Sequence, residues 1–114
     1  MARTLSRDEA LSFVRRYKEV IRSRYKSEPK VMMYGSYAKG YANPDSDIDV
    51  AVIVPGAEVK NWWEQSADLC GDVRKVSVLI EPVLMEDKED SALYRDVMRT
   101  GIAVWRIQQV RQIH

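Results

Sequence analysis

Apolar residues recur along the chain with two different periods, and each period predicts one type of secondary structure. Over residues 6–27 they recur every three or four residues, which predicts an amphipathic helix. Ser6 and Glu9 have the spacing of a capping box at its start. Pro29 ends it, because the residue before a proline is pushed out of the helical region. The same period predicts two further helices, over residues 60–74 and 91–99.

Four short segments are instead apolar throughout or alternate between two faces, as strands do. Residues 31–34 form an apolar run that ends at Gly35, and residues 36–43 fit a tight turn with one or two helical turns. Residues 75–84 and 102–107 predict two more strands. The remaining strand, residues 47–54, places Ile48, Val50, Val52 and Val54 on one face and Asp47, Asp49, Ala51 and Ile53 on the other. We expect one domain over residues 1–107 and a flexible tail over residues 108–114.

Composition narrows the class of protein. A chain of 114 residues has room for one domain, and its only cysteine, Cys70, excludes an internal disulfide framework and a cysteine-based zinc site. Its only histidine, His114, leaves no internal Ser–His–Asp triad. No apolar run approaches the roughly 20 residues that span a bilayer, and the N-terminus lacks the apolar segment of a secretion signal. We expect a soluble, cytoplasmic protein with no membrane partner.

The formal net charge of +1 conceals an asymmetry along the chain. Residues 1–30 carry nine Lys and Arg against four Asp and Glu, whereas residues 31–114 carry nine against thirteen. This distribution fits a solvated helix face followed by a carboxylate-rich remainder, or a basic surface for an acidic or phosphate-bearing partner. An evenly basic nucleic-acid binder would carry more positive charge, so the sequence gives no strong nucleic-acid signal.

Asp47 and Asp49 are the first candidates for chemistry. They lie two residues apart at the start of a strand, so their carboxylates project from one face within a few ångströms of each other. Like charges this close repel unless a cation lies between them, and carboxylate oxygens are ligands that suit Mg²⁺. By itself the pair also fits solvated carboxylates at a strand end.

Gly35 and Ser36 form a candidate phosphate cradle. They follow a buried strand and precede a helical turn, where glycine lets backbone N–H groups approach an anion and a helix N-terminus favours negative charge. Ser36 adds a hydroxyl donor. Alone the pair also fits an ordinary turn, but beside the aspartates it predicts a phosphoryl-transfer site with room for a nucleotide.

At this point the sequence resembles a known family. Residues 35–50 contain Gly35-Ser36-x-Ala38-Lys39-Gly40 followed by Ser46-Asp47-x-Asp49-Val50, a pattern similar to the signature of the nucleotidyltransferase superfamily that includes DNA polymerase beta. The likeness is strongest to its minimal stand-alone branch, the MNT domains. The resemblance implies an α/β (α+β) fold in which helices flank a mixed sheet of about four strands. It also implies that a hydroxyl attacks the α-phosphate of an NTP and pyrophosphate leaves.

The resemblance implies roles for individual residues. Asp47 and Asp49 would bind two Mg²⁺ ions, and Gly35 and Ser36 would hold the β- and γ-phosphates. Lys39 is a further candidate for phosphate binding, although a surface position on a helix also tolerates lysine. Ser46 belongs to the same motif and is included among the nucleotide-binding candidates.

A third carboxylate on a neighbouring strand normally completes the metal site of this family and can accept a proton. The matching strand, residues 76–84, contains no aspartate, and Glu81 is its only acid, near the far end of the strand. Glu81 is therefore our candidate for the third metal ligand and catalytic carboxylate. Two alternatives stay open. Glu81 is an exposed acid at a strand end, or Ser77 occupies the place of the acid and only two ligands remain.

The remaining candidates fit packing at least as well as chemistry. Trp62 and Trp63 point about 100° apart on a helix, so we expect them to pack in the core or against a partner rather than to stack together on a base. Tyr37 and Tyr41 lie near the expected site and fit either a nucleotide contact or packing against a helix. Cys70 is expected to be buried, on an apolar stripe with Trp63, Ala67 and Val73.

The resemblance implies an Mg²⁺-dependent transfer of AMP from ATP to a hydroxyl, by the antitoxin half of an MNT/HEPN toxin–antitoxin pair. Little chain remains beyond the catalytic core to bind an acceptor, so we expect a HEPN-like helical partner or a second copy of the chain. The basic first helix and the acidic residues 86–90 are candidate partner surfaces. The alternative is a non-catalytic module of this fold that masks a partner. An aminoglycoside-type adenylyltransferase is disfavoured, because those enzymes use a further substrate domain.

Overall fold

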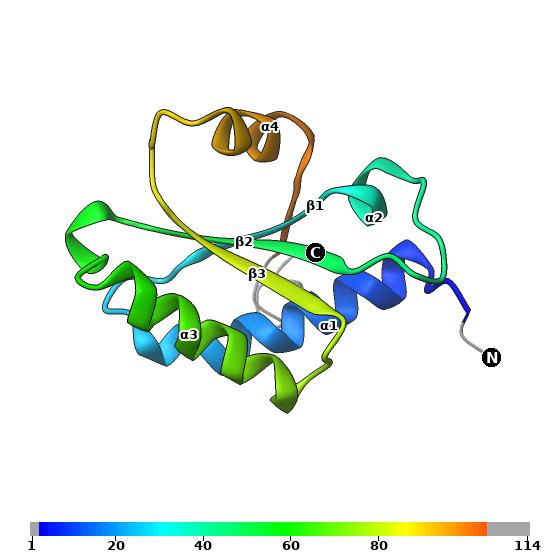
Figure 1. Cartoon of the computed structure of the whole chain (residues 1–114), viewed down its shortest axis with the longest axis horizontal. Coiled ribbons are helices and arrows are strands. Elements are labelled where there is room, and N and C mark those ends of the chain that lie inside the picture. The colour runs from blue at the N-terminus through cyan, green and yellow to red at the C-terminus, as the bar shows by residue number, and fades with distance from the viewer. Residues whose placement is uncertain (1–2, 105–114) are drawn as a thin grey trace, which may run out of the picture.

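The computed structural model describes residues 3–104, which form a four-stranded sheet with helices on both faces (Figure 1). Residues 3–104 contain four α-helices: α1 (Arg7–Ile21), α2 (Ser36–Lys39), α3 (Trp62–Asp72) and α4 (Ala92–Thr100). The strands are β1 (Lys30–Tyr34), β2 (Ile48–Val54), β3 (Ile80–Glu86) and β4 (Ile102–Val104). Short 3₁₀ turns lie at Arg22–Arg24, Gly56–Glu58 and Val73–Lys75. The expected mixed sheet flanked by helices is confirmed.

The sheet has the order β3-β2-β1-β4. β1 is antiparallel to both of its neighbours, whereas β2 and β3 are parallel and are joined through α3. The register pairs Tyr34 with Asp49 and Asp49 with Glu81. The end of β1 and the starts of β2 and β3 therefore meet at one end of the sheet.

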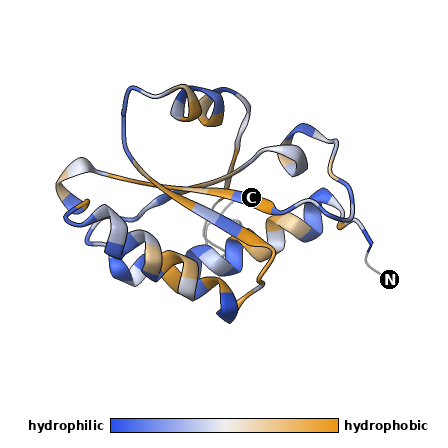
Figure 2. Ribbon diagram, in the orientation of Figure 1, coloured by the Kyte–Doolittle hydropathy of each residue, from blue (hydrophilic) through white to orange (hydrophobic). Residues whose placement is uncertain are grey.

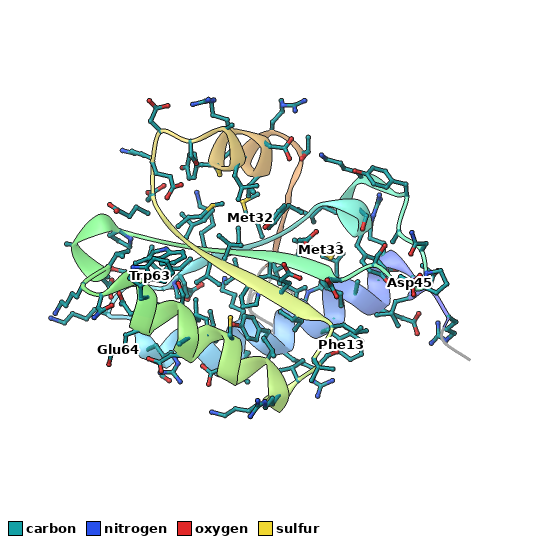
Figure 3. All side chains as sticks on the ribbon, in the orientation of Figure 1. Phe13, Met32, Met33, Asp45, Trp63 and Glu64 are labelled. Atoms are coloured by element: carbon teal, nitrogen blue, oxygen red, sulfur yellow. The ribbon has the colours of Figure 1, made fainter. Side chains whose placement is uncertain are left out.

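Two apolar layers enclose the sheet. α1 and α3 cover one face, where Val14, Tyr17 and Leu69 pack against alternate residues of β2. α4 covers the opposite face, where Val97 lies in a smaller cluster with Ala51 and Ile53. The predicted division of β2 into two faces is confirmed, and the apolar colouring of Figure 2 is concentrated on the central strands. Met32 and Met33, labelled in Figure 3, are adjacent in β1 and belong to opposite layers.

The first helix begins as its sequence predicts. The Ser6 Oγ accepts a hydrogen bond from the Glu9 backbone N–H at 3.0 Å, and a Glu9 carboxylate oxygen accepts one from the Ser6 N–H at 2.8 Å. This reciprocal pair satisfies two donors that a helix start otherwise leaves unpaired. The regular helix ends at Ile21, earlier than predicted, and a 3₁₀ turn follows it.

Two predictions from periodicity are wrong, one about where a strand begins and one about which residues of a helix face inward. The segment predicted as a strand over residues 75–84 becomes extended only at Ile80, because a 3₁₀ turn and a hydrogen-bonded turn occupy the residues before it. Of the residues predicted to face inward on the second long helix, Val73 is buried, in the 3₁₀ turn that follows α3, whereas Trp63, Ala67 and Cys70 are exposed. Leu69 is the buried apolar residue of α3 in place of Cys70. Trp63, labelled near the start of α3 in Figure 3, is 81% exposed.

β4 reaches Val104, the last described residue. The rest of the strand predicted over residues 102–107 and the tail predicted over residues 108–114 lie outside the described residues. Within residues 3–104, no helix is both long enough and apolar enough to cross a membrane.

Candidate active site

Three carboxylates gather where β2 and β3 begin. Asp47 immediately precedes β2, Asp49 is the second residue of that strand, and Glu81 is the second residue of β3. The parallel register places Asp49 directly beside Glu81, on the face of the sheet that α4 covers. The predicted position of Glu81 near the far end of its strand is therefore wrong, because Glu81 lies next to the first residue of the strand. Ser77 lies before the strand, where its hydroxyl accepts from the Leu79 N–H at 3.1 Å.

The three carboxylates perturb one another. A hydrogen bond with Asp47 is the main cause that raises the pKa of Glu81, followed by desolvation and by the charges of Asp47 and Asp49. Desolvation is the main cause that raises the pKa of Asp49, and the charge of Asp47 adds to it. A carboxyl group whose ionisation is opposed by neighbouring carboxylates gains from an added cation. The site is therefore electrostatically prepared for positive charge.

No cation within residues 3–104 neutralises this cluster, since each ion pair of lysine and arginine there involves another acid. In the same part of the chain, no group of three His, Cys, Asp or Glu side chains has the spacing of metal ligands. The carboxylates thus interact electrostatically, but they are not arranged as a complete set of metal ligands. Their chemistry, oxygen donors only and no nitrogen or sulfur, fits Mg²⁺ better than a softer metal.

Gly35 brings the backbone close to this cluster. Its φ of 74° and ψ of −151° fall in a region that residues with a side chain rarely adopt. A Cβ atom on Gly35 would collide with the Asp49 carboxylate oxygen and would lie 3.1 Å from Asp49 Cγ. Because Gly35 has no side chain, the Asp49 carboxylate can lie directly against the Gly35 backbone. Ser36, half-buried, begins α2 directly after this point.

The other motif residues have structural contacts of their own. The Ser46 Oγ accepts from the Asn43 N–H at 2.9 Å, which closes the loop leading to Asp47. The Lys39 Nζ lies 3.3 Å from an Asp96 carboxylate oxygen and so links α2 to α4. Neither side chain is free in this structure, and each would have to exchange a partner in order to bind a nucleotide.

Comparison with known proteins identifies the family to which this arrangement belongs. A family model described as a nucleotidyltransferase domain matches residues 14–104, which is most of the chain. The chain belongs to the nucleotidyltransferase domain family. The predicted resemblance is thus confirmed at the level of the family.

Solved structures with this nucleotidyltransferase fold include a candidate nucleotidyltransferase from Sulfolobus solfataricus. Its TM-score is 0.66 at 17% identity, and the match covers 90% of this chain and 86% of that chain. This likeness shows the fold. No curated protein matches the sequence at a significant level.

Two toxin–antitoxin structures also match. One is a toxin–antitoxin complex with AMP-PNP, with a TM-score of 0.49 and 20% identity over 96% of this chain and 80% of that chain. The other is the tri-AMPylated HEPN toxin of Shewanella oneidensis in complex with its MNT antitoxin, with a TM-score of 0.49 and 19% identity over 94% of this chain and 78% of that chain.

Tyr34 is a residue near the site that sequence reasoning missed. It pairs with Asp49 across β1 and β2, and its ring is buried in the layer beneath α4. Burial raises the pKa of Tyr34 to about 12, and the charges of Asp49 and Glu81 add to the effect. The signal in the sequence was its alternation with Met32 immediately before Gly35. In the antiparallel pairing of β1 with β2, this position lies opposite Asp49, the second residue of β2.

Two surface hollows of the nucleotidyltransferase domain lie away from the carboxylates. One hollow, of about 210 Å³, lies between the start of β1 and β4 and is lined by Lys18 and Val104 among others. Another, of about 190 Å³, lies beside α2 and is lined by Arg7, Tyr37 and Gly40 among others. Of the two tyrosines noted in the motif, Tyr37 is buried and its hydroxyl accepts from the Leu5 N–H at 3.3 Å, whereas Tyr41 is exposed.

Proposed function

We propose that this nucleotidyltransferase domain transfers a nucleoside monophosphate, AMP from ATP, to a hydroxyl acceptor. The observation that carries the proposal is the meeting of Asp47, Asp49 and Glu81 at one end of the sheet. Gly35 brings the backbone at the start of α2 against Asp49 at the same end. Carboxylates beside such a backbone position are the parts that phosphoryl transfer requires, because the reaction depends on positioning and on charge stabilisation.

The donor chemistry of the cluster, oxygen atoms alone, suits a divalent cation. Asp47, Asp49 and Glu81 are the residues that would hold Mg²⁺, with two ions expected beside a bound NTP. When bound, the cations supply neutralisation of the triphosphate and of the charge that develops on the departing pyrophosphate. The mutual destabilisation of the ionised carboxylates in the absence of a cation supports this assignment.

The other roles belong to the residues of the chain themselves. The backbone N–H groups at Gly35 and Ser36, with the Ser36 hydroxyl, bind the β- and γ-phosphates. The acceptor hydroxyl attacks the α-phosphorus as the bond to pyrophosphate breaks, and a Glu81 carboxylate oxygen takes its proton. Lys39 exchanges Asp96 for a phosphate oxygen. Ser46 contributes by closing the loop that carries Asp47 to the nucleotide.

We also propose that the acceptor lies on a partner protein, a HEPN-like helical protein, with this chain as the antitoxin of the pair. The basis is the resemblance of residues 35–50 to the MNT motif. Three large apolar side chains on different parts of the chain are exposed and available to a partner: Trp63 at 81%, Val78 at 77% and Tyr41 at 65%. By contrast, Asp87 and Asp90 in the acidic segment already bind Tyr94 and Arg95.

The test is label transfer. The purified chain is incubated with Mg²⁺, α-labelled ATP and any co-purified protein, and the label on protein is measured. We expect transfer by the wild type and none by the Asp47→Asn/Asp49→Asn double variant, whose fold is checked by circular dichroism. A Ser77→Ala variant serves as the matched control outside the carboxylate cluster.

Other results would change the conclusion. Full activity of the double variant would refute the assignment of the carboxylates. No transfer from any of the four NTPs by the wild type, together with neutralisation of a partner without NTP, would instead establish a non-catalytic module that masks its partner.

A further inference from the structure

α2 is a short helix that has to be held in place by other elements. It contains only four residues, and helices of this length are unstable on their own because nucleation is costly. In its backbone hydrogen bonds, the Lys39 N–H donates to the Gly35 carbonyl at 2.9 Å and the Gly40 N–H donates to the Ser36 carbonyl at 2.9 Å. The following carbonyls, of Tyr37 and Ala38, belong to the last turn of the helix, where intrahelical donors are absent.

Arg7 supplies those missing donors. Its Nη2 donates to the Ala38 carbonyl at 2.9 Å, and its Nε donates to the Tyr37 carbonyl at 3.4 Å. Arg7 is the first residue of α1, directly after the Ser6 cap. A guanidinium suits this place because it offers several donors in one rigid plane and its positive charge complements the carbonyl end of a helix.

The start of α1 is itself held against α2. The reciprocal bonds of Ser6 and Glu9 fix the backbone on which Arg7 stands, and the Leu5 N–H donates to the buried Tyr37 hydroxyl at 3.3 Å. On the other side of α2, Lys39 pairs with Asp96 of α4. The short helix is thus braced from two sides, and among residues 3–104 the side-chain bonds to its carbonyls come from α1.

We propose that Arg7 is a positioning residue for nucleotide binding, which acts by holding the carbonyl end of α2 so that Gly35 and Ser36 face the phosphates. This inference rests on the proposed function, because it assigns Arg7 to the same phosphate cradle. It also assigns the start of α1 a role beyond that of a surface helix. A change at this end of α1 is thereby transmitted to nucleotide affinity.

The experiment compares Arg7→Met with Arg16→Met in the full chain. Methionine keeps the apolar stem and removes the donors. Arg16 lies on the same helix, with its guanidinium carbon 5.8 Å from the centre of the Phe13 ring, and is the matched control. Steady-state transfer from α-labelled ATP gives KM and kcat. Hydrogen exchange monitored by mass spectrometry reports on the amides of residues 39–41.

We expect Arg7→Met to raise the KM for ATP by about 5- to 10-fold while kcat changes by less than about twofold, since ground-state positioning of the nucleotide is lost. Exchange at residues 39–41 should accelerate in Arg7→Met and stay unchanged in Arg16→Met. Arg7→Lys should recover part of the loss, because an ammonium can reach one carbonyl but not both.

Either of two results would overturn the inference: the same KM and exchange in both methionine variants, or an equal fall in kcat and thermal stability with KM unchanged. A wild type that neither binds nor uses an NTP overturns the proposed function instead. In that case exchange alone decides the role of Arg7 in holding α2, and equal rates in the two variants refute it.

Discussion

Gly35→Ala should damage the fold and the candidate site together, because the position has neither the backbone freedom nor the space for a side chain. The φ of 74° and ψ of −151° lie in a region that is accessible almost only to glycine. The added Cβ would collide with an Asp49 carboxylate oxygen, and it would lie 3.1 Å from Asp49 Cγ and 3.3 Å from Asp49 Cβ. The variant therefore has to move the backbone, Asp49 or both.

The magnitude follows from the two contributions. A residue with a side chain in this backbone region costs about 1–3 kcal/mol. Taking about 2 kcal/mol, and about 4 °C per kcal/mol for a domain of this size, we expect Tm to fall by about 8 °C. Displacement of Asp49 adds to the loss of stability and should remove nucleotidyl transfer, because that carboxylate is one of the three proposed ligands.

Thermal unfolding followed by circular dichroism measures the effect, with Gly71→Ala as the matched control. Gly71 lies in α3, and nothing would approach a Cβ there within 4 Å. Alanine should therefore be neutral at Gly71, or stabilise the helix by about 0.5–1 kcal/mol.

A double-mutant cycle with Asp49→Ala separates the two contributions. Removing the Asp49 carboxylate should recover about 1 kcal/mol of the Gly35→Ala loss, because the collision disappears and only the backbone cost remains. A Gly35→Ala variant that melts with the wild type would refute the reasoning. A coupling energy of zero would refute the collision with Asp49.

Three further predictions concern the remaining charges. Burial raises the pKa of Asp49, so the folded protein favours the protonated carboxyl. The protein therefore loses stability as pH rises from the unfolded pKa of this group through its folded pKa. Asp49→Asn should therefore melt above the wild type at pH 7 without Mg²⁺, with the difference closing below about pH 4. Asp72 has the opposite sign, because its hydrogen bonds to Arg24 lower its pKa, so its stabilisation is present above the unfolded pKa and lost as pH falls. Asp72→Asn should lose about 1–3 kcal/mol at pH 7, a difference that a pH series of melts should show closing below about pH 4. Glu81→Gln should reduce label transfer at least tenfold while Ser77→Ala does not, and equal activities would remove Glu81 from the site.

Local sequence patterns predicted the parts of the fold whose cause is local. The capping box of Ser6 and Glu9 forms as its spacing indicated. The alternation in residues 48–54 divided the strand correctly between the two apolar layers. Gly35 was identified as the position where the backbone approaches the site, and the structure gives the reason in the contact with Asp49. A period of two or 3.6 residues is a property of the chain itself, so it can be recognised without knowing the neighbours.

Predictions failed where neighbouring elements decide the outcome. Most of the stripe predicted for α3 was wrong because several of its positions are weakly apolar, and only packing against Tyr17 and the sheet shows that Leu69 rather than Cys70 faces inward. Glu81 was assigned to the wrong end of its strand, because alternation alone does not say where a strand begins. Tyr34 was missed for a similar reason, since it enters the site through antiparallel pairing with β2.

The sequence by itself determined the family, the order of the elements and the pair Asp47 and Asp49, because each depends on residues close together in the chain. Only the tertiary structure decided that Glu81 stands beside Asp49 and that Arg7 reaches the carbonyl end of α2. These contacts join segments about 30 residues apart, and they depend on strand register and on the docking of α1 against the sheet. Neither register nor docking can be read from local periodicity, since both are set by burial of the whole apolar core.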